Sequence, residues 1–148
     1  MTVEIRILRA GDEPVLASVA AGVFDHAIDA RRAAEFLADS RHHLAVAVEQ
    51  GQVVGFVSAV HYVHPDKPVA ELWINEVSVA GTHRGRGLAR DLLRAALEVA
   101  RQLGCREAWV LTDRSNAPAM HAYAGAGGVE TPPDSVMFTF HLDRDAAH

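Results

Sequence analysis

Cysteine is nearly absent from this sequence, and so are segments that direct a chain into or across a membrane. Cys105 is the only cysteine among 148 residues, so no disulfide can form within the chain, and we expect a reducing, cytoplasmic compartment. The sequence does not begin with basic residues followed by an apolar run, as a signal peptide would. No apolar run reaches the roughly 18 residues of a membrane-spanning helix. The sequence therefore predicts no membrane partner.

Positive charge is also scarce. Lysine and arginine number 14 against 19 aspartates and glutamates, which gives a formal net charge of −5. This balance argues against nucleic acid as the main partner, and an acidic surface suits a cationic ligand. Apolar residues make up 49% and charged residues 22%, which is ordinary for a globular protein, and the length suits one domain over 1–148.

Two common phosphate-binding motifs and a metal site are missing as well. A P-loop requires a Gly-Lys pair, and the chain contains none. A dinucleotide fingerprint requires a third glycine where Arg90 stands, after Gly85 and Gly87. His61 and His64 have no third ligand at a recognisable spacing, so we expect no metal.

A strand, a glycine-rich turn and a long helix follow one another between residues 69 and 104. Gly85 and Gly87 let backbone amides approach a ligand, because no Cβ atom stands in the way. The helix begins at this turn, so its unpaired N–H groups and the positive end of its dipole point to one place. Arginines add positive charge there: Arg84, Arg86 and Arg90. The combination predicts an anion site, most simply for phosphate, and the alternative is a plain connection with exposed arginines.

The strand before the turn changes phase. Ala70, Leu72 and Ile74 are apolar at even positions, whereas Val77 and Val79 are apolar at odd positions. A β-bulge produces such a one-residue slip, and bulges often lie beside active sites. The alternative is a strand buried on both faces, for which alternation carries no information. A bulge would turn one set of side chains toward a common face: Glu71, Trp73, Glu76 and Ser78.

Hydrophobic periodicity and turn residues predict the other elements. We expect strands over residues 2–8, 43–48, 53–61, 106–112 and 136–142, and helices over 12–24, 30–38, 88–103 and 117–124. The strand–helix–strand order between 69 and 112 predicts a right-handed crossover between parallel neighbours. Open α/β sheets bind ligands at the carboxyl ends of such strands.

Two motifs in this framework resemble those of the GNAT N-acetyltransferases. The run Arg84-x-x-Gly87-x-Ala89, after a strand that ends in Val77-Ser78-Val79, is similar to their acetyl-CoA-binding motif, [QR]-x-x-G-x-[GA]. The run Asn116-Ala-Pro-Ala-Met-His-Ala-Tyr123 resembles their second motif, in which an asparagine opens a helix and a tyrosine follows. The spacing between the two motifs also fits.

The resemblance covers about residues 43–128 and implies an α/β (α+β) fold of the GNAT acyl-CoA N-acyltransferase type. Its mixed central sheet would have about six to seven strands, with about four helices and a bulged fourth strand. The segment from Glu71 to Gly87 is most similar to the type I aminoglycoside 3-N-acetyltransferase-like branch. One departure is Gly127-Gly128 where the family usually has Gly-Phe, which leaves open how the chain packs after the Tyr123 helix.

The resemblance also implies a role for each part of the motifs. Backbone groups of Val77 and Val79 would pair with the pantetheine arm, and backbone amides of the turn would hold the pyrophosphate. Asn116 would contact the pantetheine, and Tyr123 would protonate the leaving thiolate. The cofactor-binding candidates are Val77, Ser78, Val79, Arg84, Gly85, Arg86, Gly87, Leu88, Ala89, Arg90, Asn116 and Tyr123.

Two carboxylates are candidates for the general base. Glu71 is similar in position to the base of histone-type members, and Glu76 to an acidic position in aminoglycoside and polyamine enzymes; each could equally be structural. A protonated amine cannot attack, so a carboxylate, directly or through a water, would take its proton. The family usually shapes its acceptor pocket near the first helices, where a solvated surface is the simpler interpretation of the polar residues Asp25, His26, Asp29 and Glu35.

The sequence thus predicts an acetyl-CoA-dependent N-acetyltransferase, with acetyl-CoA as co-substrate and no metal. It would acetylate a primary amine of a small, cationic acceptor such as an aminoglycoside or a polyamine, while amino acids and peptide amines also stay open as acceptors. Many relatives form homodimers. Two other interpretations remain. The chain could be a catalytically inactive CoA-binding module that acts as a sensor or scaffold, or a nucleotide-binding protein that prefers ATP or NAD.

Overall fold

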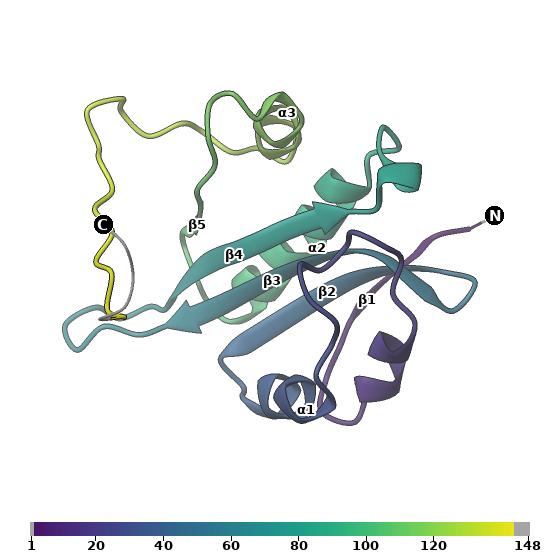
Figure 1. Cartoon of the computed structure of the whole chain (residues 1–148). Helices are drawn as coiled ribbons and strands as arrows, with labels where there is room; N and C mark the ends of the chain where they lie inside the picture. The colour runs from purple at the N-terminus through teal and green to yellow at the C-terminus, as the bar shows by residue number, and fades with distance from the viewer. Residues whose placement is uncertain (1, 144–148) are drawn as a thin grey trace.

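The computed structural model describes residues 2–143, and its strands form one mixed five-stranded sheet in the order β1-β2-β3-β4-β5 (Figure 1). Neighbouring strands pair antiparallel except β4 and β5, which are parallel. The strands are β1 (Glu4–Ile7), β2 (His42–Glu49), β3 (Gln52–Tyr62), β4 (Glu71–Val79) and β5 (Ala108–Val110). The α-helices are α1 (Ala30–Ala38), α2 (Leu88–Gln102) and α3 (Ala117–Gly125), and two short 3-10 helices are η1 (Glu13–Ala17) and η2 (Gly81–His83). No helix within the described range is long and apolar enough to cross a membrane.

Helices cover both faces of the central strands. Figure 1 shows α2 behind the sheet, while α1 and η1 pack against β2 and β3 from the other side. Residues 44–47 of β2 and 53–59 of β3 are all buried, because both of their faces are covered. The buried residues of α2 repeat with helical spacing: Leu88, Leu92, Leu93, Ala96 and Ala100.

The phase change in β4 is a β-bulge, as predicted. Ala59 of β3 pairs with Ile74, and the preceding residue, Ser58, pairs with Glu76, so Asn75 has no residue opposite it. The register then places the predicted side chains opposite alternate residues of β3, and hence on one face of the sheet: Glu71, Trp73, Glu76 and Ser78.

The predicted helix over 12–24 is wrong beyond its first turn. Only Glu13–Ala17 is helical, as η1. The backbone after it is bonded to the start of β3 instead: the Ala20 N–H donates to the Val53 carbonyl at 2.8 Å, and the Val53 N–H donates to the Ser18 carbonyl at 2.9 Å. A backbone whose hydrogen bonds are committed to a strand cannot continue a helix.

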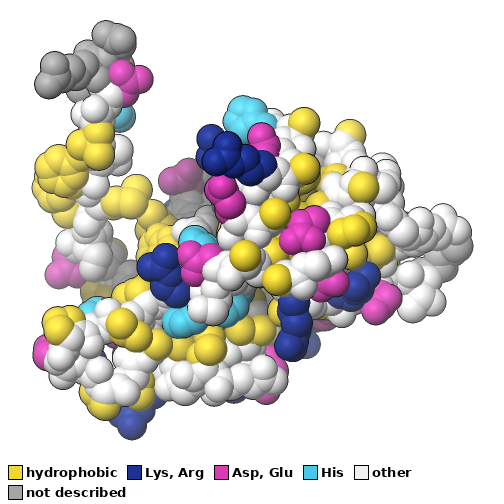
Figure 2. Space-filling model, turned by 90° about the horizontal axis from the view of Figure 1, so that it is seen from below, with side chains coloured by type: hydrophobic (Ala, Val, Ile, Leu, Met, Phe, Trp, Pro, Cys, Tyr) yellow, Lys and Arg dark blue, Asp and Glu magenta, His cyan; other side chains and the backbone are white. Residues whose placement is uncertain are grey.

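The predicted strand over 136–142 is also wrong. The described residues hold five strands and three α-helices rather than about six to seven strands and about four helices. Residues 129–143 stand away from the sheet with their large apolar side chains exposed, and Figure 2 shows these side chains along an arm of the molecule. The expected alternation is present in the sequence, but no strand of the described chain lies beside this segment to pair with its backbone.

Candidate active site

The turn after β4 presents backbone amides at the start of α2. Gly85 (φ 78°) and Gly87 (φ 77°) both adopt the left-handed conformation, which other residues adopt only with strain. Gly87 is the N-cap of α2, and no side chain in the described chain caps this helix. The first N–H groups of α2, from Leu88 onward, therefore have neither a helical partner nor a cap, and they can bind an anion.

The three arginines of the motif lie around this turn. Their contacts within the protein are long: Arg84 Nε to the Val79 carbonyl, 3.4 Å; Arg86 Nη1 to Glu49 Oε2, 3.8 Å; Arg90 Nε to Asp91 Oδ1, 4.0 Å. Exposed pairs of this length contribute little to stability, so these guanidinium groups can turn toward phosphate oxygens at small cost.

A contact that the sequence did not indicate holds the turn against the β2–β3 hairpin. His83 Nε2 lies 3.0 Å from Glu49 Oε1, and His83 Nδ1 lies 2.8 Å from Thr82 Oγ1. The hydrogen bond with His83 lowers the pKa of Glu49 and favours its charged form. Glu49 and His83 are 34 residues apart, and neither belongs to a periodic pattern, so no sequence signal could have paired them.

Beyond the bulge, β4 has a neighbouring strand on one side only. Val77 and Val79 pair with Val57 and Gly55 of β3, whereas β5 pairs with β4 only at residues 72–74. No strand of the described chain lies along the other edge of residues 77–79. Such an edge can bind an extended ligand in the way that it would bind an added strand.

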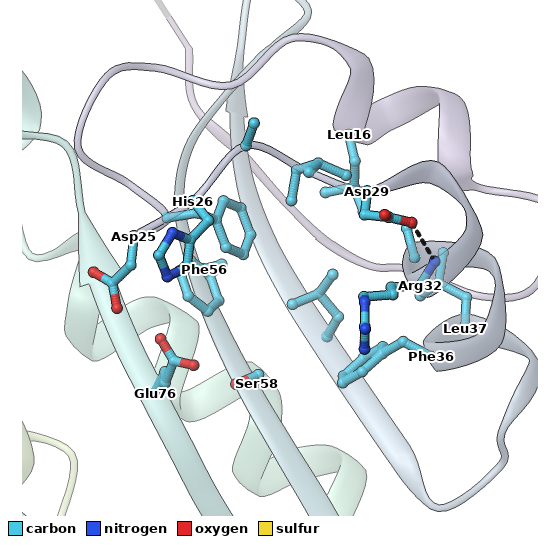
Figure 3. Close-up of a pocket in the computed structure, with 15 residues that line it drawn as sticks. Leu16, Asp25, His26, Asp29, Arg32, Phe36, Leu37, Phe56, Ser58 and Glu76 are labelled. Carbon is cyan, nitrogen blue, oxygen red and sulfur yellow. Dashed lines mark hydrogen bonds between the residues drawn. The ribbon is translucent and has the colours of Figure 1, made fainter. Parts of the chain in front are cut away.

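A small apolar pocket of about 330 Å³ opens beside Glu76, between the sheet and α1 (Figure 3). Within it Phe24 and Phe56 stack, with ring centroids 4.0 Å apart and 13° between the ring planes. Ser58, which is 9% exposed, lies opposite Glu76 in the β3–β4 register, and both line the pocket. Glu76 therefore lies between this pocket and the open edge of β4, which begins one residue later.

Three of the four polar residues considered for an acceptor pocket line this cavity. Asp25 and His26 approach it from the loop before α1. Asp29 also lines it, but its Oδ1 accepts the backbone N–H of Arg32 at 2.9 Å and so caps α1. Glu35 is elsewhere and pairs with Arg31 at 3.2 Å. Arg32 itself, Phe36 and Ser58 also line the pocket, and no motif in the sequence marks them as pocket residues.

The structure does not bring Glu71 to this pocket. Its Oε2 accepts a hydrogen bond from the Tyr62 hydroxyl at 3.1 Å and lies 3.3 Å from His64 Nε2, while Lys67 Nζ is 3.9 Å from Oε1. The contact with His64 is the main reason that the pKa of Glu71 is lowered. Glu71 and Glu76 share a face of the sheet, but Glu71 belongs to a separate polar group at the start of β4.

The second motif forms α3, as predicted. Asn116 is its N-cap, and the side-chain oxygen accepts the Ala119 N–H at 3.2 Å. Tyr123 lies on the side of α3 that packs against the core, where burial raises the pKa of its hydroxyl. α2 packs against α3, and the side chain of Arg90 lies close to Gly125, so the glycine-rich turn and the second motif are neighbours.

Gly128 explains the departure from the usual Gly-Phe. Its N–H donates to the Tyr123 carbonyl at 2.9 Å, and a Cβ atom added at residue 128 would lie only 2.9 Å from that same oxygen. A side chain at this position would therefore push residue 128 away from the Tyr123 carbonyl and disrupt the turn that ends α3.

We expect Gly128→Ala to destabilise the protein by about 1–3 kcal/mol, the usual cost of overpacking. The matched control is Gly125→Ala, because an added Cβ there meets only Arg90 Cδ at an ordinary 3.6 Å and the residue is helical. Differential scanning calorimetry of both variants checks this, and equal melting temperatures for the two would contradict the expectation that residue 128 must lack a side chain.

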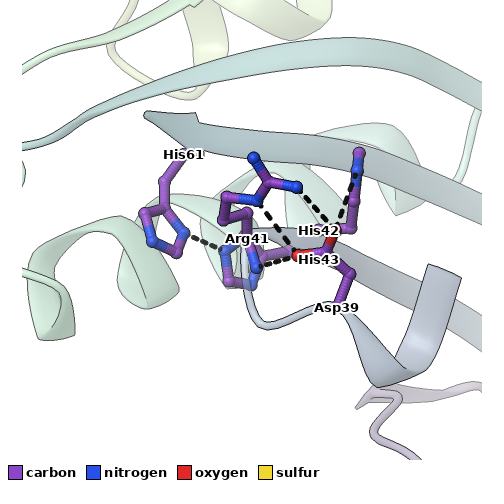
Figure 4. Close-up of polar contacts among 5 residues, drawn as sticks. All are labelled: Asp39, Arg41, His42, His43 and His61. Atoms are coloured by element: carbon purple, nitrogen blue, oxygen red, sulfur yellow. Dashed lines mark hydrogen bonds and ion pairs between the residues drawn. The ribbon is translucent and has the colours of Figure 1, made fainter. Parts of the chain in front are cut away.

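The histidines considered as metal ligands have other partners. His61 Nδ1 lies 2.7 Å from His43 Nε2, beside a cluster in which Arg41 bridges to Asp39 (Figure 4). Burial, and then the neighbouring His61, lower the pKa of His43. His64 lies against Glu71. Within residues 2–143 no group of three or more His, Cys, Asp or Glu side chains could hold a metal ion.

The parts of the site follow one another along β4 and into α2. After the bulge at Asn75, Glu76 lines the small pocket, residues 77–79 have an open edge, and the glycine-rich turn leads into the uncapped start of α2. The sequence matches the Acetyltransferase (GNAT) family over residues 13–127, and the chain belongs to that family.

Two relatives show how far the similarity extends. The streptothricin acetyltransferase of Streptomyces lavendulae is 38% identical over 101 residues, which are 68% of this chain and 51% of that protein. N-acetyltransferase family 8 member 2 of Rattus norvegicus is 35% identical over 86 residues, 58% of this chain and 38% of that protein. The chain thus spans about half of the first relative and less of the second.

Solved structures confirm the fold. An aminoglycoside acetyltransferase from an uncultured soil metagenomic sample, in complex with sisomicin, has a TM-score of 0.78 at 17% identity and covers 95% of this chain and 97% of its own. AAC(6')-Iy, in complex with the bisubstrate analogue CoA-S-monomethyl-acetylneamine, has a TM-score of 0.75 at 21% identity, with 95% and 99% covered. Because both sequence identities are low, these structures show that the fold is shared and do not show that the activity is shared.

Proposed function

We propose that residues 1–148 form a single N-acetyltransferase domain that moves the acetyl group of acetyl-CoA directly to a primary amine of a small acceptor. The observation that carries this proposal is the position of Glu76, between the pocket and the open edge of β4. Membership of the family supports the donor. The names of the streptothricin and aminoglycoside relatives support a small amine as acceptor, so aminoglycosides and polyamines belong in any first panel.

The residues of the motif fit acetyl-CoA, which would supply the acetyl group as a thioester. The uncapped start of α2 fits the pyrophosphate: backbone amides from Arg84 to Ala89 would bind it, with charge from the three arginines. The open edge at Val77–Val79 fits the pantetheine arm. Asn116 would face this arm with its NH₂ group, because its carbonyl oxygen already caps α3.

Two side chains would transfer protons, one as the general base and one as the general acid. Glu76 would take the proton of the bound ammonium group, directly or through a water, and free the amine to attack. Tyr123 would give its proton to the departing thiolate, and its raised pKa keeps that proton available at neutral pH. Glu71 is the second candidate for the base, although its own hydrogen bonds and lowered pKa make it a weaker one.

Thermal unfolding with equal concentrations of acetyl-CoA, CoA, ATP and NAD tests the donor site. A ligand at 100 times its Kd adds about 2.7 kcal/mol of stability, which raises the melting temperature of a domain this size by about 5–10 °C. We expect this shift with acetyl-CoA and CoA alone. A shift with ATP or NAD instead would indicate a nucleotide-binding protein, and no shift at all would mean that the turn is no pyrophosphate site.

Thiol release from acetyl-CoA with a panel of amines then tests catalysis. Tight CoA binding with no release for any amine would support the inactive sensor or scaffold instead. A cytoplasmic location and a homodimer stay predictions from the sequence, and light scattering on the purified chain would decide the second.

A further inference from the structure

We infer that the acceptor is an apolar amino carboxylate, a zwitterion, rather than a polycation. The inference rests on the proposed function and adds the chemical class of the acceptor. It begins with the charges around the pocket. Glu76 and Asp25 lie close together at one end, and Arg32 of α1 lies at the other end beside Phe36 (Figure 3). Asp29, the third carboxylate of the lining, also lies at the Arg32 end, where it accepts the backbone N–H of Arg32 and caps α1.

These three charged side chains have no partner within residues 2–143. Arg32, Asp25 and Glu76 form no ion pair and no side-chain hydrogen bond there, and only the backbone N–H of Arg32 is engaged, by Asp29. The neighbouring Arg31 differs, because it pairs with Glu35 at 3.2 Å on the outer face of α1. Both ends of the pocket thus keep their charge available for a ligand.

The middle of the pocket is apolar. The stacked rings of Phe24 and Phe56 form one wall, and Phe36, Leu37 and Leu44 also line it. Besides the charged residues, the only polar side chains that line the pocket are His26 and Ser58. A ligand that fills this space gains most by placing carbon against these residues.

One kind of molecule satisfies all three regions. Its ammonium group lies at Glu76, where the acetyl group would arrive, its carboxylate pairs with Arg32, and its apolar group packs on the phenylalanines. A polyamine or an aminoglycoside fits less well. A second ammonium group would lie near the Arg32 guanidinium and be repelled by it, while the Asp29 carboxylate at that end is already engaged as the cap of α1. Sugar hydroxyls against the phenyl rings would lose hydrogen bonds to water.

The test uses acceptors that differ only in the carboxylate. 6-Aminohexanoate is compared with hexylamine, and 4-(aminomethyl)benzoate with 4-methylbenzylamine, because the amine and the carboxylate must lie at opposite ends of an apolar group; spermidine and sisomicin are the polycations. The readout is kcat/KM by thiol release from acetyl-CoA, in the wild type, Arg32→Gln and the control Arg31→Gln. The preference ratio of each pair is compared between the wild type and each variant, so differences in the intrinsic reactivity of the two amines cancel.

We expect at least one carboxylate to be the best acceptor. Arg32→Gln should lower its preference over the matched amine that lacks the carboxylate by roughly tenfold or more, as the loss of a charge-assisted hydrogen bond does. Arg31→Gln should leave that ratio unchanged. An unchanged ratio in Arg32→Gln, or a wild type that prefers spermidine or sisomicin, overturns the inference and leaves the proposed function intact. No thiol release with any amine overturns both.

Discussion

Replacement of Glu76 by glutamine should lower kcat by about 10²–10⁴-fold, the usual contribution of a general base. Glutamine keeps the size and hydrogen-bonding capacity of the side chain but cannot accept a proton from an ammonium group. Glu76 is exposed in the pocket and makes no contact that stabilises the fold within the described residues. The variant should therefore melt within about 1 °C of the wild type, as expected for a surface position without structural contacts.

Glu71→Gln is the matched control, five residues earlier on the same face of the same strand. Tyr62, His64 and Lys67 hold the Glu71 carboxylate, and its lowered pKa makes it a poor proton acceptor. We expect kcat to stay within about threefold of the wild type, with a lower melting temperature because these partners lose a charge. Steady-state kinetics and calorimetry on both variants give the answer. A larger loss of kcat in Glu71→Gln than in Glu76→Gln would reverse the assignment of the base.

The parts of the fold that the sequence predicted are those with strong local signals. Residues Ala30–Ala38 form the predicted helix because Asp29 caps it. The bulge in β4 could be predicted because a slip of one residue reverses the parity of every later apolar position. The turn at Gly85 and Gly87 could be predicted because few residues other than glycine adopt its backbone conformation.

The predictions that were wrong concern residues whose contacts lie far away in the sequence. The apolar spacing over 12–24 is compatible with a helix, but the backbone groups of Ser18 and Ala20 form hydrogen bonds with the backbone of Val53 in β3 instead. The pocket combines residues from η1, the loop before α1, α1 and three strands, and no motif spans them. Arg32 has no sequence signal of its own, because an arginine on an amphipathic helix is ordinary and only the fold turns it toward Phe36.

Loss of the Tyr123 hydroxyl in Tyr123→Phe should lower kcat by about 10²-fold or more, with little change in the KM for acetyl-CoA. A thiolate leaves more easily when an acid protonates it, and phenylalanine has no proton to give. Burial raises the pKa of Tyr123 above its ordinary 10.0, so the wild type should keep its proton donor, and no alkaline loss from this group should begin below about pH 10. The hydroxyl makes no hydrogen bond within the described residues, so its removal should cost little stability.

Tyr62→Phe separates this role from the general effect of losing a partly buried hydroxyl. Tyr62 is the other tyrosine of the chain, and burial likewise raises its pKa, but its hydroxyl donates to Glu71 at 3.1 Å, away from the pocket and the turn. We expect nearly wild-type kcat and a lower melting temperature for Tyr62→Phe, the opposite pattern to Tyr123→Phe. If both variants keep their activity, another group or water protonates the thiolate, and Tyr123 serves to pack α3 against the core.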